Sequence, residues 1–314
     1  MLVGMRPHNR HRTRHTGRTV IIATIAAVVL AGGGVVAGVR AMARPPAQAH
    51  VRPAASSDAA QPAGEGGESV QTGASAADRD QELSDALGTM ADATDADFSV
   101  AVLDTASGAQ AVYGDGTYDT ASIVKVDILA ALLLTAQDAG RGLTAGEKAN
   151  ATVMIEQSDN DAATALWHSV GRADGLAEAN ERLGLTGTEG GDGDLWGLTR
   201  TTAADQLRLL QAVFGDDSPL EAASRTYLQG LMGRISDGQD WGVTAAAVPA
   251  SDTALKNGWL QRSTTGLWDI NSIGQVATDR STYLVAVLSS GNTTQAAGIA
   301  LAEDVAQAAV GAFE

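Results

Sequence analysis

The hydrophobic positions of this 314-residue chain follow helix and strand spacing only from about residue 80 onward. Three apolar residues within 81–90 lie four and three positions apart, which predicts an amphipathic helix. The segments 98–103 and 110–113 are rich in β-forming residues, and the turn at 105–108 can join them. The sequence therefore predicts a helix followed by a first β-hairpin.

The middle of this region has a helical pattern. From 123 to 136 apolar residues cover every face, which predicts a helix buried on all sides. Almost no strand pattern interrupts the next hundred residues. Further helices are expected at 149–168, 174–183, 202–214 and 220–232.

Strand patterns return near the C-terminus, at 254–260, 266–276 and 282–289, before a last helix at about 294–312. This order predicts a two-lobe α/β (α+β) fold. Both ends of the region would form one mainly antiparallel sheet of about five strands, flanked by the N- and C-terminal helices. We expect a domain at 80–314, with 80–115 and 250–314 in the sheet lobe, 116–249 in an all-helical lobe, and an active site in the cleft between them.

The N-terminal part has a different composition. Residues 1–18 contain five arginines and no acidic residue, and 19–39 form an uncharged run of 21 residues, against about 20 for a membrane-spanning helix. The run is either a signal anchor, which we favour, or a signal peptide cut after Ala41-Met42-Ala43. Residues 40–79 are poor in apolar periodicity and predict a disordered tether. The domain is therefore expected outside the cytoplasm, held on the outer side of the cell membrane or secreted.

Composition excludes several kinds of chemistry. Residues 79–314 contain 33 acidic and 13 basic residues, so nucleic acid is not expected as a partner. The absence of cysteine excludes thiol nucleophiles and disulfides. His168 is the one histidine of the domain, which excludes a multi-histidine metal site, and its position on a helix flank favours a structural role. We expect no metal, no cofactor and a monomer.

The chain has only three lysines, and two occupy informative places. Lys125 follows Ser122 by three residues, so both side chains project from one face of the predicted core helix. Burial would lower the pKa of Lys125 and let it activate the hydroxyl. The alternative is a lysine that reaches solvent through its long stem.

Two further motifs follow. Ser158-Asp159-Asn160 is a polar interruption that suits a turn or a helix N-cap, or else places Ser158 as a proton relay and Asn160 as a substrate-binding amide. Lys256-Asn257-Gly258 begins a predicted strand, where the lysine would anchor a ligand electrostatically and Gly258 would allow close approach.

In this order the three motifs resemble those of the penicillin-recognising serine enzymes, which are the class A β-lactamases and the D,D-peptidases and transpeptidases of penicillin-binding proteins. The resemblance covers about residues 80–314. It implies acylation of the serine, proton transfer by a lysine and a second serine, and an oxyanion hole of two backbone N–H groups. The residues implied are Ser122 for acylation, Lys125 and Ser158 for proton transfer, Asn160 and Lys256 for substrate, and Ser122 and Trp259 for the oxyanion hole.

The chain departs from that pattern in two places. Asn257 stands where the family usually has threonine or serine, and Arg262 either adds a positive charge near the substrate or is simply solvated. The β-lactamase motif Glu-x-x-Leu-Asn, whose glutamate activates water, is absent. Its place is taken by the glycine-rich stretch 188–196, in which Glu189 is the nearest substitute by position.

The leading hypothesis is an exported active-site serine hydrolase that is acylated by a β-lactam and hydrolyses it. One alternative is a D,D-peptidase or penicillin-binding protein acting on D-alanyl peptides of peptidoglycan. A second is a non-catalytic cell-wall binding or sensing module that uses the same cleft without turnover.

Overall fold

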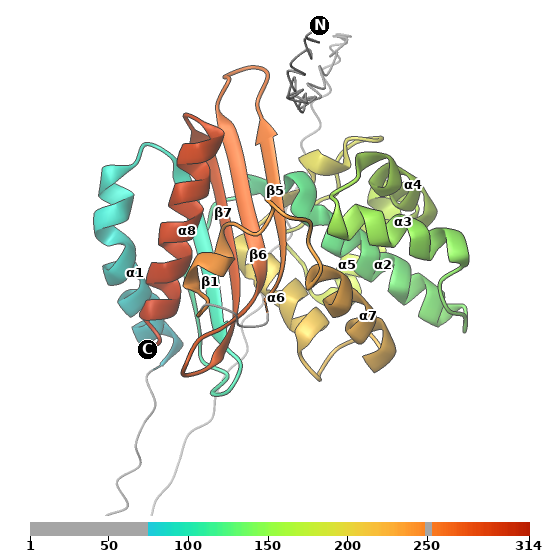
Figure 1. Cartoon of the computed structure of the whole chain (residues 1–314), viewed down its shortest axis with the longest axis horizontal. Coiled ribbons are helices and arrows are strands. Elements are labelled where there is room, and N and C mark those ends of the chain that lie inside the picture. The colour runs from blue at the N-terminus through green and yellow to red at the C-terminus, as the bar shows by residue number, and fades with distance from the viewer. Residues whose placement is uncertain (1–74, 249–252) are drawn as a thin grey trace, which may run out of the picture. The chain divides into compact units, whose positions relative to one another are not determined.

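The computed structural model describes residues 75–248 and 253–314 (Figure 1). The predicted basic segment 1–18, the apolar run 19–39 and most of the predicted tether lie outside the described residues. Within the described ranges, no helix is both long and apolar enough to span a membrane.

A five-stranded antiparallel sheet joins the two ends of the domain (Figure 1). Its order is β2-β1-β7-β6-β5, so the last three strands of the chain extend the first hairpin. This arrangement confirms the predicted sheet. The strands are β1 (Asp97–Asp104), β2 (Gln110–Tyr113), β5 (Ala254–Gln261), β6 (Trp268–Ala277) and β7 (Thr282–Asn292).

Two terminal helices, α1 (Ala76–Ala93) and α8 (Gln295–Gly311), cover one face of the sheet (Figure 1). Helix α1 begins inside the segment 40–79 that the composition assigned to a tether. Ser75 and Asp78 explain this start, because their side chains each accept a hydrogen bond from the other's backbone N–H in a capping box.

The opposite face of the sheet shares its core with the helical lobe. Helix α2 runs through this lobe and is buried on all sides, as predicted from its apolar faces. The predicted single helix 149–168 is wrong, because the chain leaves the helical path at Gln157–Asp159 and forms two helices. The helices of this lobe are α2 (Val124–Asp138), α3 (Ala145–Glu156), α4 (Asn160–Val170), α5 (Arg172–Leu183), α6 (Ala203–Phe214) and α7 (Ala222–Met232).

Short elements that the patterns did not predict connect the lobes. Strands β3 (Tyr118–Asp119) and β4 (Arg200–Thr201) pair with each other, and Thr120 N donates to Thr199 O at 2.8 Å. This pairing fixes the segment that leads into the 3₁₀ turn η1 (Ala121–Ile123). The other 3₁₀ turns are η2 (Trp196–Leu198) and η3 (Val243–Ala246).

Candidate active site

The Ser122 turn is conformationally unusual and firmly held. Ser122 lies in η1, directly before α2, and Ala121 beside it has a left-handed φ of 47°, which is unfavourable for a residue other than glycine. Asn271 on β6 donates through Nδ2 to the carbonyl oxygens of Asp119 at 2.9 Å and Thr120 at 3.0 Å. These contacts fix the backbone that presents the Ser122 hydroxyl.

Lys125 does not reach solvent. Its side chain is 0% exposed, and Nζ donates to Ser158 O at 2.7 Å, Ser158 Oγ at 3.0 Å and Asn160 Oδ1 at 2.9 Å. Burial lowers the pKa of Lys125 to about 7, although the Asp159 carboxylate opposes this shift. A substantial fraction of Lys125 is therefore an unprotonated amine at neutral pH.

Lys256 meets the same hydroxyl from the sheet. Its Nζ donates to Ser158 Oγ at 3.1 Å and to Asn257 O at 2.8 Å, and the side chain is 0% exposed. Burial, and then repulsion from Lys125, lower the pKa of Lys256 well below its usual range. Ser158 Oγ thus connects two buried amines and is placed to pass a proton between them.

The Ser158-Asp159-Asn160 motif contains a helix N-cap and also places polar side chains at the lysines. Asp159 is the N-cap of α4 and accepts from Ala162 N at 2.8 Å, while its two neighbours contact Lys125. Ser158 itself has a left-handed φ of 57°. The cap holds Ser158 in this strained conformation, with its hydroxyl directed at the lysines.

Gly258 brings strand β5 against the Ser122 turn. A Cβ at this position would lie 2.7 Å from Thr120 O and 2.8 Å from Ser122 N, distances that no side chain tolerates. Trp259 follows it, and its indole lies 6.0 Å from that of Trp241 at an interplanar angle of 59°. The oxyanion-hole role of Ser122 N and Trp259 N remains a prediction.

Asn257 is engaged within the fold. Its side chain is 1% exposed, and Nδ2 donates to Gln239 O and to Trp241 O, both at 2.9 Å. Alternation along β5 sends it away from its neighbours Lys256 and Gly258. The amide, unlike a hydroxyl, provides two N–H donors, so Asn257 ties the segment 239–241 to the sheet.

Arg262 is engaged by acidic groups. Its guanidinium pairs with Asp119 and lies 3.6 Å from Asp269 Oδ2, and Arg200 also approaches Asp119 at 3.8 Å. Burial raises the pKa of Asp269 to about 6, and the Arg262 charge opposes this. The substrate-binding role of Arg262 stays a prediction, since these contacts show it only in an internal network beside the Ser122 turn.

Glu189 is exposed at the edge of the lobe. Its backbone pairs with Arg200 through two hydrogen bonds of 2.8 Å. Among the described residues, no hydrogen bond or ion pair joins its carboxylate to the lysine cluster formed by Lys125, Ser158 and Lys256. Its catalytic role is still a prediction. The same loop instead places Trp196 over Lys125, with Nζ 5.0 Å from the ring centroid. Sequence reasoning missed this residue because a single tryptophan in a glycine-rich loop carries no spacing signal.

His168 fastens that loop to α4. Its Nε2 lies 2.6 Å from Asp194 Oδ1, and Arg172 Nε lies 3.3 Å from the same oxygen. The hydrogen bond from His168 holds the pKa of Asp194 below its usual range. In the part of the chain that the structure describes, no group of three or more histidine and acidic side chains is arranged to bind a metal ion.

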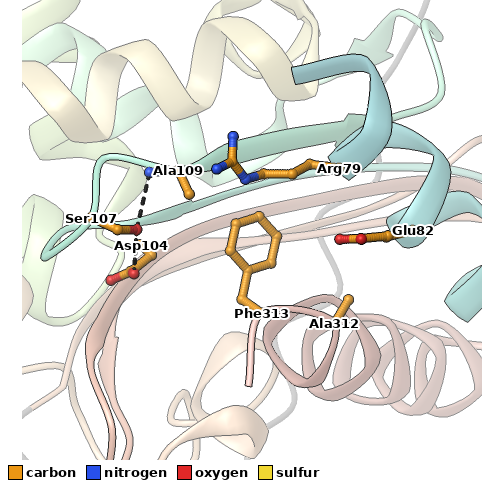
Figure 2. Close-up of a pocket in the computed structure, with 7 residues that line it drawn as sticks. All are labelled: Arg79, Glu82, Asp104, Ser107, Ala109, Ala312 and Phe313. Carbon is orange, nitrogen blue, oxygen red and sulfur yellow. Dashed lines mark hydrogen bonds between the residues drawn. The ribbon is translucent and has the colours of Figure 1, made fainter. Parts of the chain in front are cut away.

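One cavity of the fold lies apart from these motifs. Figure 2 shows it between the start of α1, the turn after β1 and the C-terminal end of α8, with the Arg79 and Phe313 side chains lining it. Ser107 Oγ donates to the Asp104 carboxylate at 2.5 Å on one side. At about 180 Å³ it is smaller than a typical ligand site of roughly 300–1,000 Å³. We therefore place the candidate site at the lysine cluster, on the chemistry of its residues.

A family model described as the β-lactamase enzyme family matches residues 148–313, more than half of the chain. The chain belongs to the β-lactamase enzyme family. The match includes Ser158, Asn160 and Lys256, whereas Ser122 and Lys125 precede it. The fold brings Lys125 to Ser158 and the Ser122 backbone to Gly258. Members of this family are serine hydrolases that act on amide bonds of β-lactams.

Solved class A β-lactamases share the fold. A β-lactamase from Xanthomonas campestris pv. campestris is 20% identical, with a TM-score of 0.64, over 75% of this chain and 99% of its own. A class A representative from Bacteroides cellulosilyticus is 17% identical, with a TM-score of 0.65, over 75% and 98%. An ancestral class A β-lactamase is 23% identical, with a TM-score of 0.62, over 74% and 100%. The search of curated proteins found no match.

Proposed function

We propose that this chain is an exported acyl-serine hydrolase that opens β-lactams through an ester at Ser122. Ser122 Oγ attacks the amide carbon while its proton passes to the unprotonated Lys125 Nζ. The C–N bond then breaks, and the leaving nitrogen takes a proton through Ser158 Oγ. Water finally cleaves the ester, which releases the acid and restores the Ser122 hydroxyl.

The observation that carries the proposal is the hydrogen-bonded arrangement of Lys125, Ser158 and Lys256. A general base works best when its pKa lies near the working pH, and burial brings that of Lys125 to about 7. Ser158 Oγ lies within hydrogen-bond distance of both amines, so a proton taken from Ser122 has a route toward the leaving group. Family membership and the class A fold point to the same chemistry.

A second candidate function follows from the loop 188–196, because the residue of this loop that contacts Lys125 in the described structure is Trp196 and not a carboxylate. If no carboxylate activates water at this position, the ester at Ser122 persists, and the protein behaves as a penicillin-binding protein or D,D-peptidase. The family's water-activating motif is absent, and Glu189 is the nearest substitute by position, so its carboxylate would have to approach the ester during the reaction.

We also propose that the domain works outside the cytoplasm, since the basic segment 1–18 followed by the apolar run 19–39 favours export. A fusion of residues 1–79 to a periplasm-dependent reporter tests this part. Reporter activity is expected, and its loss on replacing the apolar run by polar residues would be consistent with export. Activity that survives the replacement would contradict it.

Intact-mass spectrometry of the domain with a penicillin separates the candidate functions. A transient adduct accompanied by hydrolysed product supports a β-lactamase, and a lasting adduct supports a penicillin-binding protein. No adduct at any pH from 6 to 9 defeats the acylation proposal and leaves the binding module. Glu189→Gln should retain acylation and lose turnover if Glu189 activates water.

A further inference from the structure

The indole of Trp196 is the one aromatic contact of the Lys125 amine among the described residues. Nζ lies 5.0 Å from the ring centroid, within the roughly 6 Å over which an aromatic face attracts a cation. The three N–H groups of the charged amine already point to oxygen acceptors on Ser158 and Asn160. The ring therefore adds a separate electrostatic contact that competes with none of these hydrogen bonds.

The ring is fixed in place by its own hydrogen bond. Trp196 Nε1 donates to Thr164 Oγ1 at 3.1 Å, and that hydroxyl donates to Asn160 O at 3.0 Å. Thr164 and Asn160 lie one turn apart on α4, so the helix that positions the Asn160 amide also orients the indole. Movement of the ring relative to Lys125 would require breaking this chain of hydrogen bonds.

The loop around Trp196 is also tied down. Trp167 Nε1 donates to Gly193 O at 2.8 Å, and Thr199 N donates to Trp196 O at 3.1 Å. His168 and Asp194 hold the outer part of the loop to α4. Together these contacts hold the indole in place before any substrate arrives.

We propose that Trp196 is a positioning residue for Lys125, whose indole stabilises the charged amine and holds it against Ser158 and Asn160. The proposal rests on the proposed function, in which Lys125 takes the proton of Ser122. The other charged groups that act on Lys125 are Asp159, before α4, and Lys256, on β5. Trp196 and Asp159 thus favour the cation, whereas burial and Lys256 oppose it.

Substitution of the indole by an aliphatic group of similar apolar character isolates this effect. Trp196→Leu removes the aromatic face and keeps an apolar side chain at this position, so the pKa of Lys125 should fall, by about one unit. In the pH profile of the acylation rate, the midpoint of the rise on the acidic side should move to lower pH by the same amount. Trp196→Phe keeps a weaker aromatic face and should lower the pKa of Lys125 by less than Trp196→Leu does. Thr164→Val keeps the indole but removes the hydroxyl that orients it. This variant should also lower the pKa of Lys125 by less than Trp196→Leu does.

The titration can be measured on the chain itself. Because there are only three lysines, ¹³C-lysine NMR gives three signals, which single Lys→Arg variants assign. Trp268→Leu, which removes an indole packed on the outer face of the sheet, is the matched control and should leave Lys125 unchanged.

An unchanged or raised titration midpoint (pKa) of Lys125 in the folded Trp196→Leu variant would overturn the proposal. If that variant does not fold, an unchanged midpoint in Thr164→Val overturns it. Should the wild type form no adduct while the midpoint still moves, the proposed function fails and the positioning role of Trp196 stands.

Discussion

The buried carboxyl of Asp127 gives the fold a specific pH dependence. Asp127 lies on α2 and is 1% exposed, and neither of its oxygens has a hydrogen-bond partner among the described residues. Burial raises the pKa of Asp127 to about 7. The nearby Asn180 amide opposes this shift without reaching hydrogen-bonding geometry, and Asp205 adds to it.

The sign of the effect follows from the two pKa values. In the unfolded chain Asp127 ionises near its ordinary value of 3.8, so between pH 4 and 7 the folded state binds more protons than the unfolded state. The contribution of Asp127 to the free energy of unfolding is fully present below pH 4 and is lost as pH rises to about 7. At about 1.4 kcal/mol per pH unit, the full loss is on the order of 4 kcal/mol, of which roughly 2–3 falls between pH 5 and 7.

Asp127→Asn removes this ionisation at nearly constant volume. Urea unfolding followed by far-UV circular dichroism at pH 5, 6, 7 and 8 should show the variant gaining roughly 2–3 kcal/mol over wild type between pH 5 and 8. The exposed Asp279→Asn is the control and should follow the wild-type curve within about 0.5 kcal/mol. A constant difference between Asp127→Asn and wild type across this range would refute the reasoning.

Three further outcomes follow from the site. Ser158→Ala removes the hydroxyl between the two lysines and should slow acylation by about 10²–10⁴-fold in a stopped-flow assay; a change below tenfold would contradict the relay. Gly258→Ala forces β5 away from the Ser122 turn and should slow acylation by about 100-fold without unfolding the domain, so a wild-type rate would contradict the close approach. Asn257→Ser leaves a carbonyl of the segment 239–241 without its donor and should lower the free energy of unfolding by about 1–3 kcal/mol, whereas no change would contradict the anchoring role.

Local patterns predicted most of the fold because its elements are long and strongly periodic. Apolar residues cover every face of the segment 123–136, which favoured a core helix, and the segment 282–289 is a run rich in strand-forming residues. The predicted helical range 149–168 runs across Gln157–Asp159, although the polar motif Ser158-Asp159-Asn160 itself indicated a turn or an N-cap there. The pair β3 and β4 was missed because two-residue strands have no period.

The site was predictable where motifs carry it and not where tertiary contacts do. Spacing and resemblance singled out Lys125 and Ser158, which the fold brings into contact, and Ser122, whose catalytic role stays a prediction. The direction of the Asn257 side chain depends on which face of β5 meets the Ser122 turn, and the contact of Trp196 with Lys125 depends on how a distant loop folds back. Neither is encoded in local spacing.

The central claim is that Ser122 forms the acyl-enzyme, and peptide mapping tests it most directly. Trypsin cuts after Arg79 and Lys125 with no basic residue between them, so Ser122 falls in the single peptide 80–125. After acid quenching of the domain with a penicillin, we predict the penicilloyl mass on this peptide at Ser122, and none in Ser122→Ala. An adduct that persists in Ser122→Ala, or maps to another residue, would contradict the account.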